Sequence, residues 1–175
     1  MSFTNGKVKS YFSGTFESVE GRSLYLRFAA GLQNWTERIR RCRFAAQASP
    51  TMRHVAVIGA SSSLGRALLS RFSDSKIVGS FHSAAGVPRG DAKLFHLDLT
   101  DDSSIRSFAD SLRAEVPSLD VAIFAAGAIA GRRLAEYDDD EIERIVSVNF
   151  TGQAKLIRAM LPLFANNSQL VMVSS

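Results

Sequence analysis

The sequence alternates short apolar segments with segments of helical periodicity, and this alternation limits the fold more than any other feature. Residues 54–59 (HVAVIG) are apolar and β-branched and end at glycine, as expected of a strand buried on both faces. Leu64, Leu68 and Phe72 then recur at helical spacing. Further strands are predicted at 76–81, 93–97, 120–125 and 169–173. The alternation predicts an α/β fold, a three-layer Rossmann-type doubly wound parallel sheet of about five strands.

The segments between these strands are predicted to be helices, with one exception. Helices are expected over 64–73 and from the acidic run 138–141 onward. Another is expected with its cap and first negative charges at 100–102, its apolar face over 105–116 and its stop at Pro117. Residues 84–92 contain glycine and proline, so this connection is expected to be a loop. We interpret the acidic run as a solvated helix start. With one cysteine and three scattered histidines, no metal site is predicted.

The N-terminal 51 residues differ in charge from the rest of the chain. They contain eight Lys/Arg and three Asp/Glu, whereas residues 52–175 contain 13 and 14. We therefore divide the chain into a basic N-terminal extension, residues 1–51, and a nucleotide-binding domain, residues 52–175. No apolar run reaches the roughly 18 residues needed to span a bilayer.

Three interpretations of the extension remain open. Its arginines and an amphipathic stretch are typical of an organelle transit peptide; the stretch comprises Leu24, Phe28, Leu32, Trp35 and Ile39. Alternatively it is a poorly ordered extension or a start-site artefact, and the protein is cytoplasmic. A third interpretation is an anionic or nucleic-acid surface formed by Arg38, Arg40, Arg41 and Arg43. Such clusters are more often solvated, so nucleic acid is not an expected partner.

The turn after the first buried strand has the composition of a phosphate-binding turn. Gly59 permits a tight turn, and Gly65 permits close approach of the following helix. Ser61, Ser62 and Ser63 offer hydroxyl donors beside the backbone N–H groups of a helix start. The alternative is a turn of small residues that only packs.

From this turn onward, residues 53–175 resemble the short-chain dehydrogenase/reductase superfamily. The family's Thr-Gly-x-x-x-Gly-Ile/Leu-Gly corresponds to Ile58–Gly65, with Leu64 matching and with Ile58 and Ser63 as departures. The resemblance implies cofactor contacts from Gly59, Ser61, Ser62, Ser63, Leu64 and Gly65. It also implies that Asp98 and Leu99, after the strand 93–97, frame the adenine. A helix-capping role is the alternative for Asp98.

Three further motifs follow the family's order. Its Asn-Asn-Ala-Gly corresponds to Phe124, Ala125, Ala126 and Gly127, so the amide that ties neighbouring strands is absent. Ala125, Ala126 and Gly127 are nevertheless expected to border the cofactor. Val148–Gly152 resembles Val-Asn-Leu/Phe-x-Gly, which implies that Asn149 holds a water in a proton relay. Val173, Ser174 and Ser175 resemble the end of the fifth strand, which makes Ser175 the catalytic serine.

The resemblance implies an NAD(P)-dependent oxidoreductase that transfers a hydride between nicotinamide and a small carbonyl or alcohol substrate. The family's acid/base pair, Tyr-x-x-x-Lys, is not formed by Tyr11, Tyr25 or Tyr137, because none has lysine four residues later. We expect that pair beyond Ser175, so that this chain is the cofactor-binding part and leaves strand 169–173 as an unpaired edge. The alternative is a non-catalytic dinucleotide-binding or interaction module.

Cofactor choice and self-association are also indicated. Residues 80–83 (SFHS) lack the acidic side chain that would accept the ribose 2′-OH of NAD, and His82 or Arg66 could reach a 2′-phosphate. The sequence therefore favours NADP. In the family, the long helices after the fourth and fifth strands commonly form the contacts between subunits. Only the first of these helices is expected within this sequence, so a homo-oligomer is left open.

Overall fold

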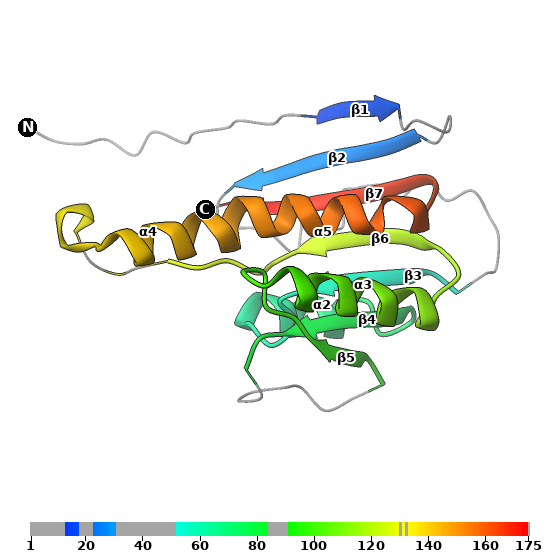
Figure 1. Ribbon diagram of the computed structural model, residues 1–175. Helices are drawn as coiled ribbons and strands as arrows, with labels where there is room; N and C mark the ends of the chain where they lie inside the picture. Colours follow the sequence, from blue (N-terminus) through cyan, green and yellow to red (C-terminus); the bar gives the residue numbers. More distant parts are fainter. Residues whose placement is uncertain are drawn as a thin grey trace, which may run out of the picture.

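The fold is built on one seven-stranded sheet in the order β1-β2-β7-β6-β3-β4-β5, as seen in the computed structural model (Figure 1). The structure describes residues 13–17, 23–30, 52–83, 91–129, 131 and 133–174. Its strands are β1 (Ser13–Glu17), β2 (Ser23–Ala30), β3 (His54–Ile58), β4 (Lys76–Phe81), β5 (Lys93–His96), β6 (Leu119–Phe124) and β7 (Phe164–Ser174).

The five strands from β3 to β7 form the parallel sheet that the sequence predicts. β3 lies at its centre and pairs in parallel with β4 on one side and with β6 on the other. The chain therefore moves outward through β4 and β5, returns across β3, and continues through β6 and β7. This is a doubly wound α/β fold, and its topological switch point lies between β3 and β6, where such folds bind ligands.

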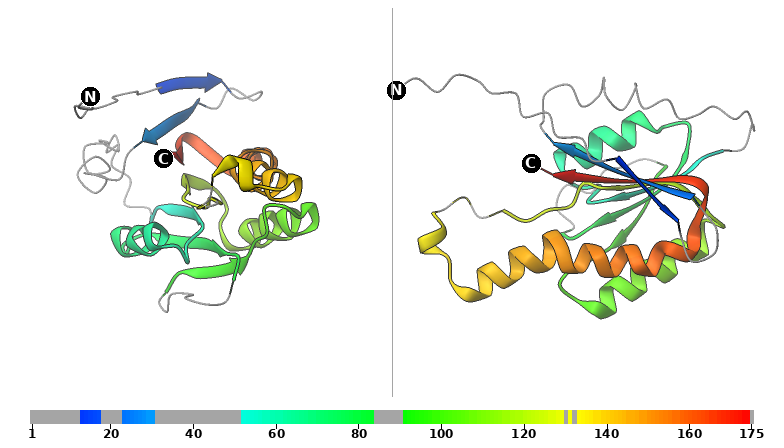
Figure 2. Two further views of the ribbon diagram at one scale, coloured as in Figure 1. Left: turned by 90° about the vertical axis from the view of Figure 1, so that its left-hand side faces the viewer. Right: turned by 90° about the horizontal axis from the view of Figure 1, so that it is seen from above.

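Helices cover both faces of the sheet (Figure 2). They are α2 (Ser63–Arg71), α3 (Asp102–Glu115), α4 (Asp139–Val146), the π-helical turn η2 (Ser147–Thr151) and α5 (Gly152–Met160), with 3₁₀ turns η1 (Leu134–Glu136) and η3 (Leu161–Leu163). The core lies in two layers because alternate strand residues point to opposite faces. In β3, Ala56 and Ile58 pack in the cluster that includes α3 and α5, whereas Val55 and Val57 pack in the cluster that includes α2.

The helix starts follow the sequence closely. Ser62 caps α2, Asp101 caps α3 and Asp138 caps α4, each by accepting a hydrogen bond from a backbone N–H in the first turn. The acidic run 138–141 is therefore a helix start, as predicted. Most of the predicted loop 84–92 lies outside the described residues.

Two strands of the N-terminal extension continue the sheet at its β7 edge, which was not predicted from the sequence. β2 runs parallel to β7 with Leu24 beside Ser168 and Ala30 beside Ser174, and β1 pairs antiparallel with β2. The expectation that β7 would be an unpaired edge is therefore wrong. Leu24 and Phe28, which we assigned to an amphipathic stretch, belong to β2, because a spacing of four fits both the helical and the strand period.

The extension's other predicted features lie outside the described residues. These are Leu32, Trp35 and Ile39 of the amphipathic stretch and the arginines Arg38, Arg40, Arg41 and Arg43. β7 is also longer than the predicted strand 169–173 and contains Asn167 at a positive φ of 62°.

Candidate functional site

The turn after β3 is packed so closely that two of its positions require glycine. Gly59 has a φ of +88°, and a Cβ there would lie 2.7 Å from the backbone nitrogen of Ala126. A Cβ on Gly65 would collide with the carbonyl oxygen of Gly59 and lie 2.6 Å from the Cα of Ala60. The structure thus shows the tight turn and the close helix approach for which the sequence singled out these glycines. The turn touches the loop after β6, which brings the two sides of the switch point together.

The three serines of the turn have different local roles. The hydroxyl oxygen of Ser62 accepts a hydrogen bond from the N–H of Gly65 at 2.9 Å, which leaves its hydroxyl hydrogen able to reach a ligand. The carbonyl oxygen of Ser61 accepts from the guanidinium of Arg66 at 3.0 Å. Ser63 is exposed and begins α2, whereas Leu64 packs against the core on that face. The first N–H groups of α2 and the Ser62 hydroxyl form a donor set that suits an anion.

A residue that the sequence analysis did not single out, Ser80, holds this turn in place. Its side chain is 2% exposed, and its Oγ accepts a hydrogen bond from the N–H of Gly59 at 2.9 Å. Its carbonyl oxygen accepts from the N–H of Ala60 at 2.7 Å. The only signal in the sequence is a hydroxyl residue inside an otherwise apolar strand, a position that usually requires a hydrogen-bond partner.

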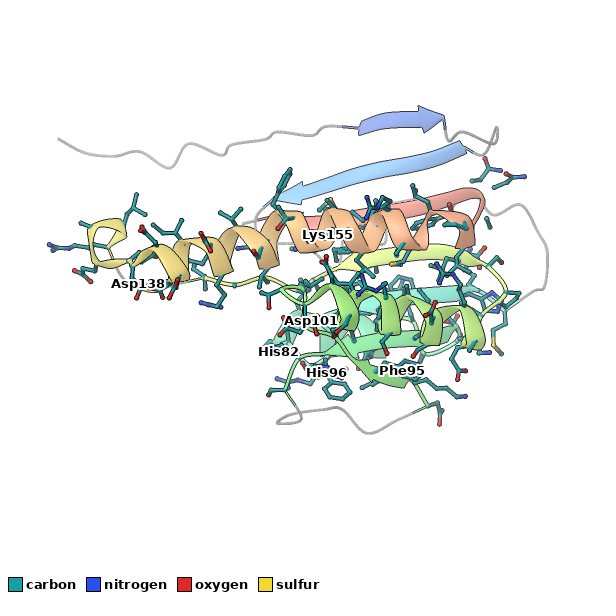
Figure 3. All side chains as sticks on the ribbon, in the orientation of Figure 1. His82, Phe95, His96, Asp101, Asp138 and Lys155 are labelled. Atoms are coloured by element: carbon teal, nitrogen blue, oxygen red, sulfur yellow. The ribbon has the colours of Figure 1, made fainter. Side chains whose placement is uncertain are left out.

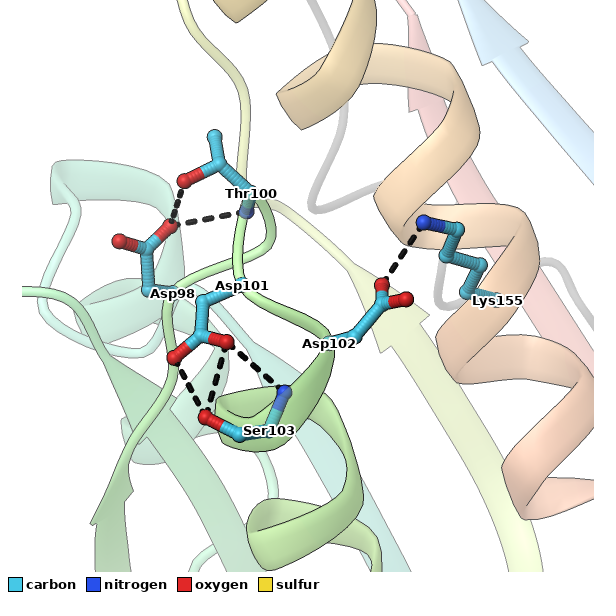
Figure 4. Close-up of polar contacts among 6 residues, drawn as sticks. All are labelled: Asp98, Thr100, Asp101, Asp102, Ser103 and Lys155. Carbon is cyan, nitrogen blue, oxygen red and sulfur yellow. Dashed lines mark hydrogen bonds and ion pairs between the residues drawn. The ribbon is translucent and has the colours of Figure 1, made fainter.

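Asp98 lies in the loop after β5 and is held as a carboxylate (Figure 4). Its Oδ1 accepts hydrogen bonds from the Oγ1 of Thr100 at 2.7 Å and from the N–H of Thr100 at 2.8 Å. These bonds, together with the nearby His82, lower the pKa of Asp98 below its ordinary value. The helix cap is Asp101, so the capping alternative for Asp98 is wrong.

Two histidines, His82 and His96, lie near each other at the ends of β4 and β5 (Figure 3). His82 follows β4, its side chain is 74% exposed, and its Nε2 lies 3.7 Å from Oδ2 of Asp98. Its ring centre lies 6.0 Å from that of His96, the last residue of β5. Leu99, the residue after Asp98, is buried, and its carbonyl oxygen fills the space that a Cβ on Gly152 would need. The loop is thereby fitted against the start of α5.

The loop after β6 is fastened on two sides. On the sheet side, the N–H of Ala125 donates to the carbonyl oxygen of Ile58 at 2.8 Å. On the helix side, Nδ2 of Asn149 donates to the carbonyl oxygen of Ala128 at 2.6 Å, and Oδ1 accepts from the N–H of Ala128 at 3.0 Å. Asn149 lies in the π-helical turn η2, a distortion often found at functional sites.

Gln153, which the sequence analysis also missed, is the second helix-side contact. Its Nε2 donates to the carbonyl oxygen of Ala126 at 3.0 Å, and the residue is 6% exposed. The missing amide at Ala125 therefore does not leave the loop unsupported, because helix-borne amides hold it instead. Asn149 is expected to hold a relay water, and the structure shows its amide bonded to Ala128.

The predicted site residues in the described part of the chain converge on one edge of the sheet. The turn at Gly59, the loop 125–127 and Asn149 adjoin one another through the contacts above. Phe124 pairs with Met172, so β7 ends beside the start of this loop. Ser174 is the last residue of β7, and Ser175 lies outside the described residues.

Two further predictions concern metal and membrane. In the part of the chain that the structure describes, no group of three or more His, Cys, Asp or Glu residues could hold a metal ion. Over the same residues, no helix has the length and apolar character that a membrane crossing requires.

The chain is similar in sequence and in fold to known oxidoreductases. Residues 60–175 match the family model described as enoyl-(acyl carrier protein) reductase. The chain is 30% identical over 82 residues to an uncharacterised NAD-dependent oxidoreductase of Mycobacterium tuberculosis, which covers 45% of this chain and 30% of that protein. It is 28% identical over 113 residues to the 3-oxoacyl-[acyl-carrier-protein] reductase of Salmonella typhimurium, which covers 60% and 46%.

Among solved structures, the aldohexose dehydrogenase of Thermoplasma acidophilum in its ligand-free form is similar with a TM-score of 0.64 and 25% identity. The superposition covers 71% of this chain and 49% of that one. The regions matched are thus less than half the length of each of these three proteins.

Proposed function

Because this chain belongs to the short-chain dehydrogenase/reductase family, whose model matches residues 60–175, we propose that it is the dinucleotide-binding part of an NAD(P)-dependent oxidoreductase. The reaction proposed is hydride transfer between the nicotinamide of the cofactor and a small carbonyl or alcohol substrate. The close packing of the Gly59 turn against the loop after β6, at the switch point of the sheet, is the observation that carries the proposal.

The residues around the switch point suit a dinucleotide. The first N–H groups of α2 and the hydroxyl of Ser62 would hold the pyrophosphate. The loop at Asp98 and Leu99 would frame the adenine, on the side of β4 and β5. Ala125, Ala126 and Gly127 would border the nicotinamide, on the side of β6. Gly59 and Gly65 allow the turn to pack closely against the loop after β6 and against the start of α2.

Two residues are proposed to act near the substrate. Asn149 would keep the loop after β6 in position through its paired hydrogen bonds to Ala128, and bind the relay water that the family resemblance implies. Ser175 would donate a hydrogen bond to the substrate oxygen. The tyrosine and lysine that move the proton in the family are expected to follow Ser175, so activity is proposed for the whole oxidoreductase.

NADP is proposed as the preferred cofactor. Ser80, Phe81, His82 and Ser83, at the end of β4, include no carboxylate for a ribose 2′-OH, and His82 is exposed there. Protonated His82, whose Nε2 lies 3.7 Å from Oδ2 of Asp98, would attract a 2′-phosphate. The Mycobacterium tuberculosis relative is named NAD-dependent, so both cofactors need testing.

A cofactor titration tests the proposal. The full chain is titrated with NADPH and with NADH, with binding followed by nicotinamide fluorescence. We expect saturable binding of both and a lower dissociation constant for NADPH. Absence of a saturable signal for either cofactor at millimolar concentration would refute dinucleotide binding, and equal or tighter binding of NADH would refute the NADP preference.

A pair of glycine variants shows whether binding uses the turn. In Gly59→Ala, the positive φ and the contact with Ala126 should destabilise the fold by at least about 2 kcal/mol and weaken binding more than tenfold. Gly131→Ala is the matched control because a Cβ there meets nothing within 4 Å. Similar affinity in the two variants would place the site elsewhere.

We propose that two copies of the chain associate through the exposed face of α4 and η2. Ile142, Val146 and Phe150 are exposed and spaced four apart, so they share one face of α4 and η2. Asp139, Asp140 and Glu141 are in the first turn of α4, and Lys155 and Arg158 are in α5. An antiparallel second copy would place apolar against apolar and acidic against basic residues, which favours a homodimer.

A further inference from the structure

We propose that Gln153 is a positioning residue for the nicotinamide half of the site and acts through the carbonyl oxygen of Ala126. The inference rests on the proposed dinucleotide binding. Gln153 is one of only three buried polar or charged residues among those the structure describes; the others are Ser80 and Ser168. A buried amide is costly unless it is hydrogen-bonded, and Gln153 donates to Ala126 at 3.0 Å.

Gln153 and Asn149 are four residues apart, so they lie on one face of the helix. Asn149 holds the backbone of Ala128 by two hydrogen bonds, and Gln153 holds Ala126. Gly127 lies between these anchors, and a Cβ there would be 3.1 Å from Oδ1 of Asn149. The two amides thus fix alternate residues of the loop.

Ala126 also joins this loop to the glycine turn. Its backbone nitrogen lies where a Cβ on Gly59 would come within 2.7 Å, while its carbonyl oxygen accepts from Gln153. The same peptide segment is therefore confined by the turn on one side and by the helix on the other. Loss of the Gln153 hydrogen bond would free the helix side alone.

The order of the strands explains why Gln153 should affect binding of the nicotinamide half of the cofactor rather than the adenosine half. In a doubly wound sheet the adenosine ribose is held at the end of the strand that follows the glycine turn, which here is β4. The other half of the dinucleotide must then lie across β3, toward β6. Gln153 supports the loop after β6, whereas the loop at Asp98 is held by Thr100 and Ser104.

Separate measurement of the two halves of the cofactor tests this role. Dissociation constants for NADPH and for AMP are measured by calorimetry on the full chain. Gln153→Met keeps the volume and removes the donor, so NADPH binding should weaken about fivefold, the size of one net hydrogen bond, while AMP binding stays within about twofold. Ala154→Met adds the same side chain at an exposed neighbour and should change neither.

The binding results distinguish a failure of the proposed dinucleotide binding from a failure of the role proposed for Gln153. If the unmodified chain binds neither NADPH nor AMP, the proposed function fails. If it binds both and Gln153→Met weakens both equally or neither, the positioning role is wrong.

A measurement on the unmodified protein covers the case in which Gln153→Met does not fold. NADPH should slow hydrogen exchange at the amides of Gly127 and Ala128, and AMP should not. Equal protection by the two ligands would overturn the inference.

Discussion

At the residue scale, the ionisation of Asp98 predicts how the free energy of unfolding depends on pH. Because its folded pKa is lowered, chiefly by the Thr100 side-chain and backbone hydrogen bonds, ionised Asp98 stabilises the fold above its unfolded pKa of about 3.9. That contribution is lost as the pH falls through the lower, folded pKa. Thr100→Val removes one of the two bonds to Thr100 and keeps the backbone one.

We expect the pKa of Asp98 in Thr100→Val to rise part of the way to its ordinary value. Carbon-13 NMR of the side-chain carboxyl would follow the titration, and the loss of unfolding free energy between pH 6 and pH 3 should be smaller than in the unmodified protein. Thr151→Val, the same change at an exposed position of η2, is the control. An unchanged Asp98 titration would mean that the Thr100 hydroxyl is not the main cause.

Individual residues also differ in whether their role in the site could be predicted from the sequence. Gly59 and Gly65 could be predicted, because their roles depend on a local strand-turn-helix pattern. Ser80 and Gln153 could not, because each acts through a partner distant in sequence: Gly59 for Ser80 and Ala126 for Gln153. The loop support expected to be missing at Ala125 is supplied from another element.

At the scale of elements, the exposed face of α4 and η2 makes a second prediction. α4 extends past the carboxyl edge of the sheet, has no buried residue, and leads into η2, where Phe150 is 70% exposed (Figure 1). If this face joins two copies, Phe150→Ser should shift a dimer to monomer in sedimentation velocity. Leu161→Ser changes another exposed apolar residue away from this face and should leave the assembly intact. A monomer in the unmodified protein would contradict the proposal.

The elements themselves were largely predictable from residue 52 onward. Strands β3, β4, β5 and β6 lie within one residue of their predicted bounds, because apolar runs between turn residues are local signals. β2 was misassigned because Leu24 and Phe28 satisfy two periods, and only pairing with β7 decides between them. That pairing is a long-range contact that no local pattern contains.

At the scale of the whole molecule, the extension and the domain share a sheet, which predicts the effect of removing the extension. Deletion of residues 1–51 would expose the backbone donors and acceptors of β7 along the edge that β2 now covers. We expect a lower melting temperature and aggregation by light scattering. Deletion of residues 1–12 leaves both strands and is the control. Equal stability and solubility of the two deletions would show that β2 contributes nothing to the sheet.

The pairing of β2 with β7 also bears on how the chain folds during synthesis. β2 leaves the ribosome early, but its parallel partner β7 is synthesised only after β3 to β6, at about 5 to 20 residues per second. For several seconds β2 would have β1 as a neighbour but an open edge on its other side, which makes that edge a natural binding site for a chaperone. The strand translated among the first would thus be among the last to fold, and its pairing with β7 would close the longest loop between paired strands in the described part of the chain.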